Sequence, residues 1–410
     1  MKRLTALLLA VACDEGTAPQ TAADAQVSVP ASATVSEVRA VVPGSTFPSE
    51  VVIQNANNNL DLVEHEGRLF LAFRTAPTHF ASVKAMLYVV STLDEQTWRL
   101  EGQFAEHRDV REPRFLSLNG ALVLLYAVLG EEPTAFEPQG MKRSVWLGEG
   151  GFGPAAEFME PGFIPWRAKA VDGVGYLMAY SGGANIYTLN GDPIEVHFFR
   201  TLDGEHFEPF DREHPVVLSG GTSETDFVFL DDGALVAVAR NEAGEEGLGF
   251  GSKICRGEAG AEAVWRCVVD PRKFDSPLVF REGKNVYLLA RRNLSETGNY
   301  DLNYDGRPLA DGGDDGQPLA DQAASNQIGY WTKPKRCALW QIDPDALTVT
   351  FILDLPSRGD TCFPSAVRRA AHDFLVYNYS SPIDAGGEDP TWMKGQIGPT
   401  LIYRQRLQLP

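Results

Sequence analysis

The sequence predicts an all-β fold, a six-bladed β-propeller of four-stranded antiparallel blades. Three observations predict it. Six stretches have the alternating apolar pattern of a β-hairpin, and five of them turn on glycine at intervals of about 50 to 60 residues. Each hairpin precedes a third strand-like run. In five of the six repeats a fourth strand-like run follows the third. Four strands per repeat is the composition of a propeller blade.

The hairpin at residues 223–242 has the clearest layout. Apolar residues alternate up to Asp232 and Gly233, a pair typical of a tight turn, and resume after it. Because antiparallel strands return to the end where they began, Glu224 and Arg240 are expected to lie together, away from the turn. The same layout recurs at residues 57–74, 110–128, 166–183, 274–292 and 359–380.

The outer strands follow in chain order. Third strands are expected to start near Ala85, Arg143, Ile194, Gly251, Cys337 and Thr400. Fourth strands are expected around residues 98–100, 157–159, 207–210, 265–269 and 349–353. The sixth blade has no such run before Pro410. We therefore expect residues 49–54 to pair with the C-terminal strand and close the ring.

Length and charge limit the kinds of partner. Residues 48–410 are expected to form the propeller as one domain and as a monomer, because repeats stacked around one axis share one core. The chain has 36 basic and 55 acidic residues, a net charge of -19. This charge repels phosphate backbones and anionic membranes, so nucleic acid is excluded as a partner. No cofactor is expected.

The N-terminus has the layout of an export signal. Lys2 and Arg3 precede the apolar run Leu4–Leu9, and the residues that follow, 10–13, resemble a bacterial lipoprotein box. The resemblance implies a signal at residues 1–13, a lipid anchor on Cys13, and a secreted or cell-envelope location. An ordinary secretory peptide is the alternative. Residues 14–47, rich in Ala, Thr, Ser and Pro, are expected to be a flexible tether.

Four further cysteines predict two disulfides. In an exported chain an even number of cysteines favours pairing over free thiols, which are the alternative. Cys255 and Cys267 fall on neighbouring strands of blade four, while Cys337 and Cys362 fall in blades five and six. We therefore predict the pairs Cys255–Cys267 and Cys337–Cys362. No cluster with the spacing of a metal site is present.

Blade five contains an insertion at residues 293–334. It holds a near-duplication, Asp-Gly-Arg-Pro-Leu-Ala-Asp at residues 305–311 and Asp-Gly-Gln-Pro-Leu-Ala-Asp at residues 315–321. The spacing does not match a calcium-binding EF-hand loop, so a solvated loop is expected, with calcium binding as the alternative. The insertion starts at the end of its hairpin that carries Arg291 and Arg292, and so is placed to overhang a site there.

Charged residues gather at the hairpin ends that meet at the mouth of the central channel. The hairpin starts carry Asp61, Glu112, Arg114, Arg167, Lys169, Glu224, Asp226, Asp275 and Asp360. The hairpin ends carry Arg74, Tyr126, Tyr180, Arg240, Arg291, Arg292, Tyr377 and Tyr379. One interpretation is a set of structural ion pairs, Asp61 with Arg74, Glu224 with Arg240 and Asp275 with Arg292.

The other interpretation is a polar ligand site. Ion pairs of this kind add little net stability, so stability alone poorly explains so many at one end. Carboxylates and arginines bind hydroxyl-rich or anionic sugars through several hydrogen bonds. Aromatic residues near the same ends could stack on a sugar face; they are Phe163, Trp166, Tyr126 and Tyr379.

With these residues the chain resembles the sialidase superfamily of six-bladed propellers. That family has a Glu at a strand start, an Asp-Gly turn, and an Arg after it, which here are Glu224 and Arg240. The resemblance implies that Glu224 polarises a catalytic tyrosine and that Arg240 holds a substrate carboxylate. Residues 91–98 and 201–207 resemble degenerate versions of the family's Asp-box, a structural turn.

The chain departs from the family at three positions. Residues 58–61 stand where the family opens with Phe-Arg-Ile-Pro. His79 lies in the loop that carries the acid/base aspartate of the family. Residues 360–363 stand where the family has its nucleophilic tyrosine. Sialic acid cleavage by the family mechanism is therefore not predicted. A glycosidase that uses a pair of carboxyl groups can be built from the same pocket.

Two functions remain open, a glycoside hydrolase and a non-catalytic propeller that binds a glycan or a protein. For the hydrolase the candidate catalytic residues are Glu224, Asp61 and Asp360. The candidate substrate-binding residues, which surround the channel mouth, are Arg74, Glu112, Arg114, Arg167, Arg240, Asp275, Arg292 and Tyr379.

Overall fold

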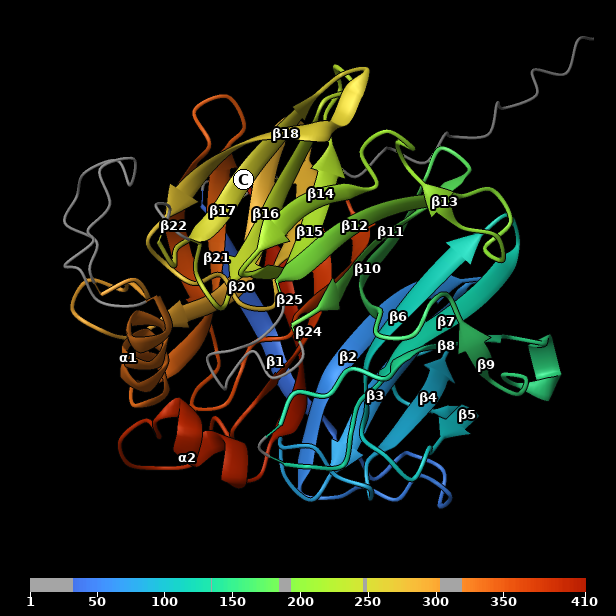
Figure 1. The fold of residues 1–410 in the computed structure, drawn as a ribbon. Coiled ribbons are helices and arrows are strands. Elements are labelled where there is room, and N and C mark those ends of the chain that lie inside the picture. Colours follow the sequence, from blue (N-terminus) through green and yellow to red (C-terminus); the bar gives the residue numbers. More distant parts are fainter. Residues whose placement is uncertain (1–31, 134, 184–192, 246–248, 303–318) are drawn as a thin grey trace, which may run out of the picture.

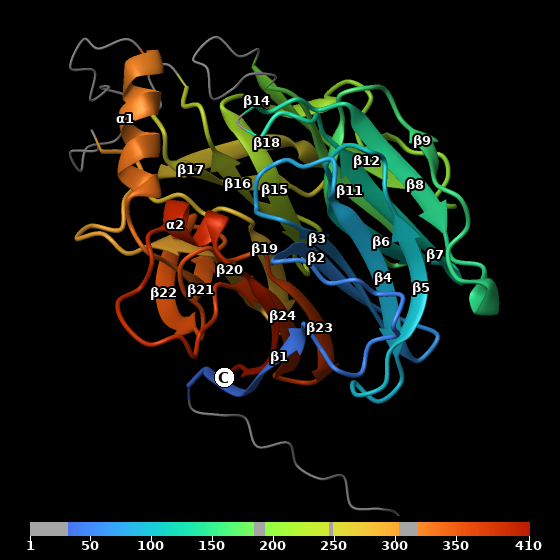
Figure 2. The same ribbon diagram turned by 90° about the horizontal axis from the view of Figure 1, so that it is seen from below.

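The computed structural model describes residues 32–133, 135–183, 193–245, 249–302 and 319–410, which form six antiparallel sheets around a common axis (Figure 1). Each sheet is one blade. The first strands of neighbouring blades contact one another, so they line the axis, and the later strands lie outward (Figure 2). The predicted all-β, six-bladed propeller is confirmed.

Blades one to three follow the predicted hairpins. Blade one contains β2 (Ala56–His65), β3 (Arg68–Ala76), β4 (Met86–Thr92) and β5 (Arg99–Phe104). Blade two contains β6 (Val110–Leu118), β7 (Ala121–Val128), β8 (Gly140–Val145), a 3-10 turn (Gly148–Gly150) and β9 (Ala156–Phe158). Blade three contains β10 (Ile164–Val171), β11 (Val174–Gly182), β12 (Ile194–Thr201), and β13 (Glu208–Pro209) and β14 (Val216–Gly220), which both pair with β12.

Blades four to six repeat the arrangement. Blade four contains β15 (Thr222–Phe229), β16 (Leu235–Asn241), β17 (Ser252–Glu258) and β18 (Ala261–Asp270). Blade five contains β19 (Leu278–Glu282), β20 (Asn285–Asn293), α1 (Leu319–Trp331), β21 (Lys335–Asp343) and β22 (Thr348–Leu355). Blade six contains β23 (Ser365–Ala370), β24 (Asp373–Ser380), α2 (Trp392–Ile397) and β25 (Leu401–Gln408). Neither described helix is long and apolar enough to cross a membrane.

The fourth strand of blade six is β1 (Thr34–Val42), which pairs antiparallel with β25. The prediction that residues 49–54 supply this strand was wrong. Those residues form no strand, and their backbone amides bind blade one: Val52 N donates to Tyr88 Oη at 3.2 Å and Gln54 N to Thr75 Oγ1 at 2.8 Å. Residues 34–42 of the expected tether are therefore part of the propeller. The predicted signal and the rest of the tether, up to residue 31, lie outside the described residues.

The insertion of blade five is not the continuous loop that its composition predicted. Residues 319–331 form helix α1, whose sequence contains the helix formers Ala and Gln and follows Pro318. The near-duplication hid this helix, because its second copy runs into the first turn. Residues 303–318 lie outside the described residues. The alternative that the insertion binds calcium therefore stays a prediction.

Aromatic rings fill the interfaces between blades and block the channel. Phe198 of β12 contacts Phe210 and Phe227, with ring centroids 4.6 and 4.9 Å away. At the axis, Trp166 of β10 meets Phe363, which precedes β23, edge to face at 5.4 Å. Phe363 lines the pocket described below, and Trp166 is buried against it, so the two rings are called the floor of that pocket.

Bulges in the inner strands turn polar side chains toward this mouth. The register shifts between Asn58 and Leu60 in β2, between Arg111 and Arg114 in β6, between Pro165 and Arg167 in β10, and between Thr222 and Thr225 in β15. Asn59 (φ 42°) and Glu112 (φ 53°), at two of these bulges, and Ser276 (φ 52°), just before β19, have left-handed backbone. Such bulges and unusual backbone angles concentrate near functional sites, where they redirect side chains.

Both predicted disulfides, Cys255–Cys267 and Cys337–Cys362, are present. Cys255 and Cys267 are direct cross-strand neighbours in β17 and β18. The two sequences that resemble Asp-boxes form turns, in which Asp94 accepts from the amides of Gln96 and Thr97 and Asp203 from those of Glu205 and His206. Neither turn contributes a residue to the pocket at the channel mouth, so the two turns support only the fold.

Candidate active site at the channel mouth

A pocket of about 530 Å³ opens at the channel mouth. Its charged lining consists of Arg111, Glu112, Glu224, Arg240, Glu242, Lys273, Asp275 and Arg291. Its aromatic lining consists of His79, Phe80, Phe136, Tyr180, Trp331, Phe363, Tyr379 and Trp392. Helices α1 and α2 supply Trp331 and Trp392, so the insertion of blade five overhangs the pocket as expected. This mixture of cations, carboxyls and ring faces is suited to a polar ligand that has one less polar face.

Glu224 and Arg240 lie together in this pocket, as the hairpin predicted. Arg240 Nη1 is 2.8 Å from Glu224 Oε1, and the guanidinium also donates to Ser223 Oγ at 2.9 Å. The other oxygen, Glu224 Oε2, accepts from the amide of Ser276 at 2.6 Å. Burial raises the pKa of Glu224 to about 7, against the opposing effect of Arg240. Glu224 can therefore hold or release a proton near neutral pH.

Glu112 presents a second carboxyl to the pocket. Its Oε1 accepts from Asn59 Nδ2 at 3.3 Å, and its Oε2 has no hydrogen-bond partner among the described residues. Burial raises the pKa of Glu112, and Arg114 opposes the rise. Both carboxyls are therefore less acidic than usual, which is a common property of groups that transfer protons.

Asp275 is held differently, because cations surround it. Arg291 Nη1 lies 2.7 Å from Asp275 Oδ2, and the hydroxyl of Tyr330 on α1 donates to the same oxygen at 2.6 Å. Burial would raise the pKa of Asp275, but Lys273, Arg291 and Arg240 hold it at about 2. Asp275 is thus a fixed anion that orders the cations around it.

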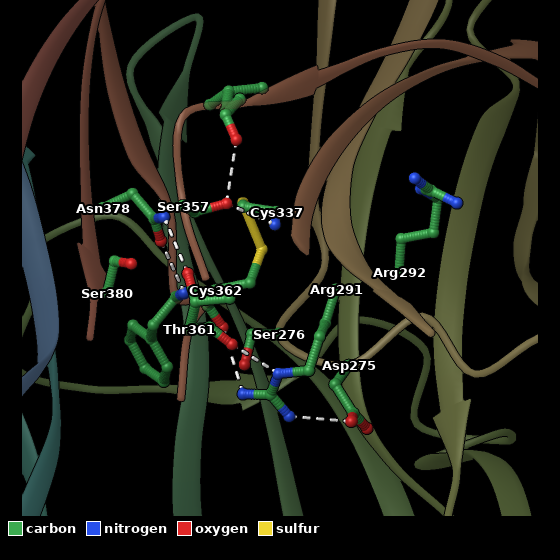
Figure 3. The surroundings of a disulfide bond; sticks show 12 residues. Asp275, Ser276, Arg291, Arg292, Cys337, Ser357, Thr361, Cys362, Asn378 and Ser380 are labelled. Carbon is green, nitrogen blue, oxygen red and sulfur yellow. Dashed lines mark hydrogen bonds and ion pairs between the residues drawn. A yellow bond between two sulfur atoms is a disulfide. The ribbon is translucent and has the colours of Figure 1, made fainter. Parts of the chain in front are cut away.

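Arg291, not Arg292, points into the pocket. Figure 3 shows Arg291 directed toward Asp275 and the backbone of Thr361, to which its Nε donates at 2.5 Å, while Arg292 points the other way. Arg292 instead pairs with Asp354 of β22, Nε to Oδ1 at 2.8 Å. Neighbouring strand residues face opposite sides of a sheet, so the sequence could not decide between the two without the register. The expected pair of Asp275 with Arg292 was wrong.

Tyr379, Asp360 and His79 form a hydrogen-bonded row beside Arg291. The Tyr379 hydroxyl donates to Asp360 Oδ1 at 2.9 Å, and His79 Nδ1 lies 2.7 Å from Asp360 Oδ2. Tyr379 and His79 line the pocket, whereas Asp360 is buried behind them. Burial raises the pKa of Tyr379 well above its ordinary value. Asp360 therefore orients two lining groups and does not face the pocket itself.

Four other predicted residues also do not line the pocket. Asp61 accepts from Phe115 N at 2.8 Å and from Ser365 Oγ at 2.7 Å, so it joins three blades and does not pair with Arg74. Arg74 pairs with Asp109, Nη2 to Oδ1 at 2.6 Å. Arg167 donates to the carbonyl of Pro277 at 2.8 Å. Arg114 lies under the floor. Each is more deeply placed than its position at a hairpin end suggested.

The aromatic candidates divide in the same way. Tyr379 lines the pocket. Trp166 is buried in its floor, Tyr126 donates its hydroxyl to Glu106 at 2.8 Å, and Phe163 packs on His197 with ring centroids 4.8 Å apart. Two of the rings that line the pocket, Trp331 and Trp392, come from helices α1 and α2, which the sequence interpretation had not found.

Sequence reasoning also missed Arg111, Glu242 and Lys273. A signal for Glu242 was available, because it lies two residues after Arg240 and a strand places such residues on one face. Glu242 Oε2 is 2.6 Å from Lys273 Nζ and 3.4 Å from Arg240 Nε. Within the described ranges there is no group of three or more His, Cys, Asp or Glu side chains arranged to hold a metal ion.

No protein-family model and no curated protein matches the sequence. Solved structures do match in fold. A Dyadobacter fermentans protein of unknown function aligns with a TM-score of 0.59 at 14% identity over 93% of this chain and all of its own. Trypanosoma rangeli sialidase in complex with the inhibitor DANA aligns with a TM-score of 0.57 at 11% identity over 87% of this chain. The endosialidase of phage phi92 aligns with a TM-score of 0.52 at 10% identity over 88% of this chain.

These likenesses define a sialidase-like six-bladed propeller, which confirms the resemblance as far as the fold is concerned. The aligned region spans 55% of the trypanosomal sialidase and 68% of the phage endosialidase. At such low sequence identities the comparison shows only the similarity of fold, and the function has to be argued from the site itself.

Proposed function

We propose that this protein is a glycoside hydrolase that acts on an acidic sugar in the pocket at the channel mouth. The observation that carries the proposal is the pair Glu112 and Glu224, two carboxyls that line one pocket and whose pKa values burial raises. Hydrolysis of a glycosidic bond by the common route needs one carboxyl to protonate the leaving oxygen and a second to act as base or nucleophile. The glycan-related structural neighbours support the same substrate class.

The cations of the pocket supply affinity for an acidic group. Arg240 and Arg291 lie on neighbouring blades and both approach Asp275, at 3.8 and 2.7 Å. Arg111 lines the pocket from the inner strand of blade two. A guanidinium matches a carboxylate in shape and charge, so an acidic sugar would bind against this side. Trp331 and Trp392 provide ring faces on which a sugar can stack.

The roles of the two carboxyls follow from their surroundings. Glu224, with a pKa of about 7, is partly protonated at neutral pH and can donate to the leaving oxygen. Glu112 has a free oxygen and a cation, Arg114, beneath it, so it is the better base. Asp61 and Asp360 are not needed in this scheme, because other protein groups occupy their oxygens.

A panel of aryl glycosides tests the proposal, with glucuronides, galacturonides and N-acetylneuraminides as the acidic members and neutral hexosides for comparison. We expect turnover of an acidic member, and a loss of roughly 10²- to 10⁴-fold in kcat for Glu112→Gln and Glu224→Gln. Glu157→Gln, on the exposed edge of blade two, is the matched control and should keep full activity. Saturable binding of an acidic sugar without turnover would instead assign the pocket to glycan recognition, the alternative function.

The two disulfides support export of the chain. Disulfides persist in oxidising compartments and are rare in reducing ones. Together with the N-terminal sequence, they favour a secreted or envelope-bound protein. If the lipid anchor exists, the protein should incorporate labelled palmitate, and Cys13→Ala should abolish the incorporation. Secretion of unlabelled protein would indicate an ordinary secretory signal peptide instead.

A further inference from the structure

Arg114 is buried under the pocket floor between two aromatic rings. It lies on β6 with no exposed surface, and the carbon of its guanidinium is 4.7 Å from the ring centre of Trp166 and 4.5 Å from that of Phe363. Phe363 itself lines the pocket. The cation therefore sits where blades two, three and six meet, directly beneath the proposed active site.

The hydrogen bonding of Arg114 is unlike that of a structural arginine. None of its three guanidinium nitrogens has a hydrogen-bond partner among the described residues. Arg74, which is equally buried, donates to Asp109, to Asn58 Oδ1 and to the carbonyls of Thr78 and Phe80. A buried cation without such partners contributes poorly to stability, because ring contacts replace only part of its lost hydration.

Among the described carboxylates, Glu112, which lines the pocket, is the one with an oxygen within 4 Å of the Arg114 guanidinium. Arg114 Nη2 lies 3.7 Å from Glu112 Oε2, and that oxygen has no hydrogen-bond partner in the part of the chain that the structure describes. Both residues lie at the register shift between Arg111 and Arg114, where Glu112 has left-handed backbone.

We propose that Arg114 is a positioning residue for Glu112, which it orients from below the floor and keeps able to ionise, as the role of a base requires. At 3.7 Å the Arg114–Glu112 contact is longer than a hydrogen bond, so Arg114 favours the ionised form of Glu112 through its charge. The inference rests on the proposed function in that Glu112 takes part in proton transfer.

Several other charged groups near Glu112 also influence its pKa. Arg111 of β6 and Arg240 of β16 favour its ionised form, while Asp109 and, from β15, Glu224 oppose it. Arg74 of β3 also interacts with it. Among the charges that lower the pKa of Glu112, Arg114 has the largest effect. Burial raises this pKa, and its effect is larger than that of Arg114.

The test follows the protonation of Glu112 directly in the full-length protein. Protein labelled with ¹³C at the Glu side-chain carboxyl carbons is titrated by NMR, and the Glu112 signal is assigned by its loss in Glu112→Gln. In Arg114→Met the midpoint should rise by about 1 to 3 pH units, the range that an opposite charge at this distance produces. A midpoint within about 0.3 of the wild type would overturn the proposal.

Two further variants keep the test informative. Arg114→Lys retains the charge without the planar fork, so its midpoint should lie between those of the wild type and Arg114→Met; it also serves if the Met variant does not fold. Arg358→Met, a buried arginine whose partners include the carbonyls of Gly387 and Glu388, is the control and should leave the Glu112 midpoint unchanged.

An activity readout separates this inference from the proposed function. If an aryl glycoside is turned over, the acidic limb of its kcat/KM profile should move to higher pH in Arg114→Met by the same amount as the Glu112 midpoint. If Glu112→Gln leaves turnover unchanged, the proposed role of Glu112 fails, yet the NMR titration still reports whether Arg114 controls its proton. An unchanged acidic limb alongside a shifted midpoint would show that Arg114 controls a carboxyl that the reaction does not use, which contradicts the proposed role of Glu112 in catalysis and supports its control by Arg114.

Discussion

Arg240 Nη1 lies 2.8 Å from Glu224 Oε1, and the side chains of the two residues are only 15% and 9% exposed. The pair joins the two ends of hairpin β15–β16 and at the same time lines the pocket. It is therefore both an interaction within one blade and a part of the proposed site. Its energetic role can be measured separately from any activity.

Removal of either partner should lower stability only moderately. Because burial has already raised the pKa of Glu224 to about 7, the carboxyl can take up a proton when Arg240→Ala removes its cation. We expect a loss of about 1–3 kcal/mol, as for one broken buried hydrogen bond, and less for Glu224→Gln, which keeps the shape. Urea unfolding measures both. Arg292→Ala, which breaks the half-exposed pair with Asp354, is the control and should cost less than about 1 kcal/mol. A loss of more than about 4 kcal/mol in both variants would mark the pair as purely structural.

Glu224 should make stability fall as the pH rises from about 4.5 to about 7. Its pKa is about 7 in the folded chain and near 4.5 ordinarily, so between these values the folded state holds a proton that the unfolded state has lost. The slope from this one group is at most about 1.4 kcal/mol per pH unit. Urea midpoints at pH 5 and pH 7 should therefore differ less in Glu224→Gln than in the wild type. Equal slopes would mean that Glu224 titrates normally.

The two disulfides should differ in their effect on the pocket. Each is expected to add about 2–4 kcal/mol to stability by restraining the unfolded chain. Only Cys337–Cys362 borders the site, because Arg291 Nη2 donates to the carbonyl of Cys362 at 3.3 Å. The double Ala variant of this pair should weaken binding of an acidic sugar, measured by calorimetry. The Cys255–Cys267 double variant is the matched control, and an equal loss of affinity there would contradict the assignment of Arg291.

Gly395 should be needed for the seating of helix α2. A Cβ at this position would lie 2.9 Å from Cβ of Asp360 and in collision with its backbone nitrogen. Gly395→Ala must therefore push α2, and with it Trp392, away from Asp360, at a cost of about 1–3 kcal/mol. Gly386→Ala, where no atom lies within 4 Å of the added carbon, is the control. A Gly395→Ala protein with wild-type melting temperature and ligand affinity would show that the α2 wall is adaptable.

Local pattern was enough to find the hairpins, because the alternation of apolar residues and the Asp-Gly turn at Asp232 and Gly233 act over a few residues. The same reasoning placed Glu224 beside Arg240 and paired the cysteines correctly, since strand neighbours follow from chain order. It failed at residues 49–54 and at α1. Strand β1 joins β25 across the whole length of the chain, and the near-duplication disguised the start of the helix.

The sequence by itself determined the number of blades, the strands that face the axis and the chemical character of the channel mouth, because these depend on the period of the apolar pattern. Only the tertiary structure decided which charged residues reach the pocket. Bulges in the inner strands set whether a side chain such as Glu112 faces the pocket or, like Asp61, is held by backbone and side-chain groups of neighbouring blades. A shift of one residue turns a side chain to the other face of its strand, as with Arg291 and Arg292, and that register is fixed by contacts between distant segments.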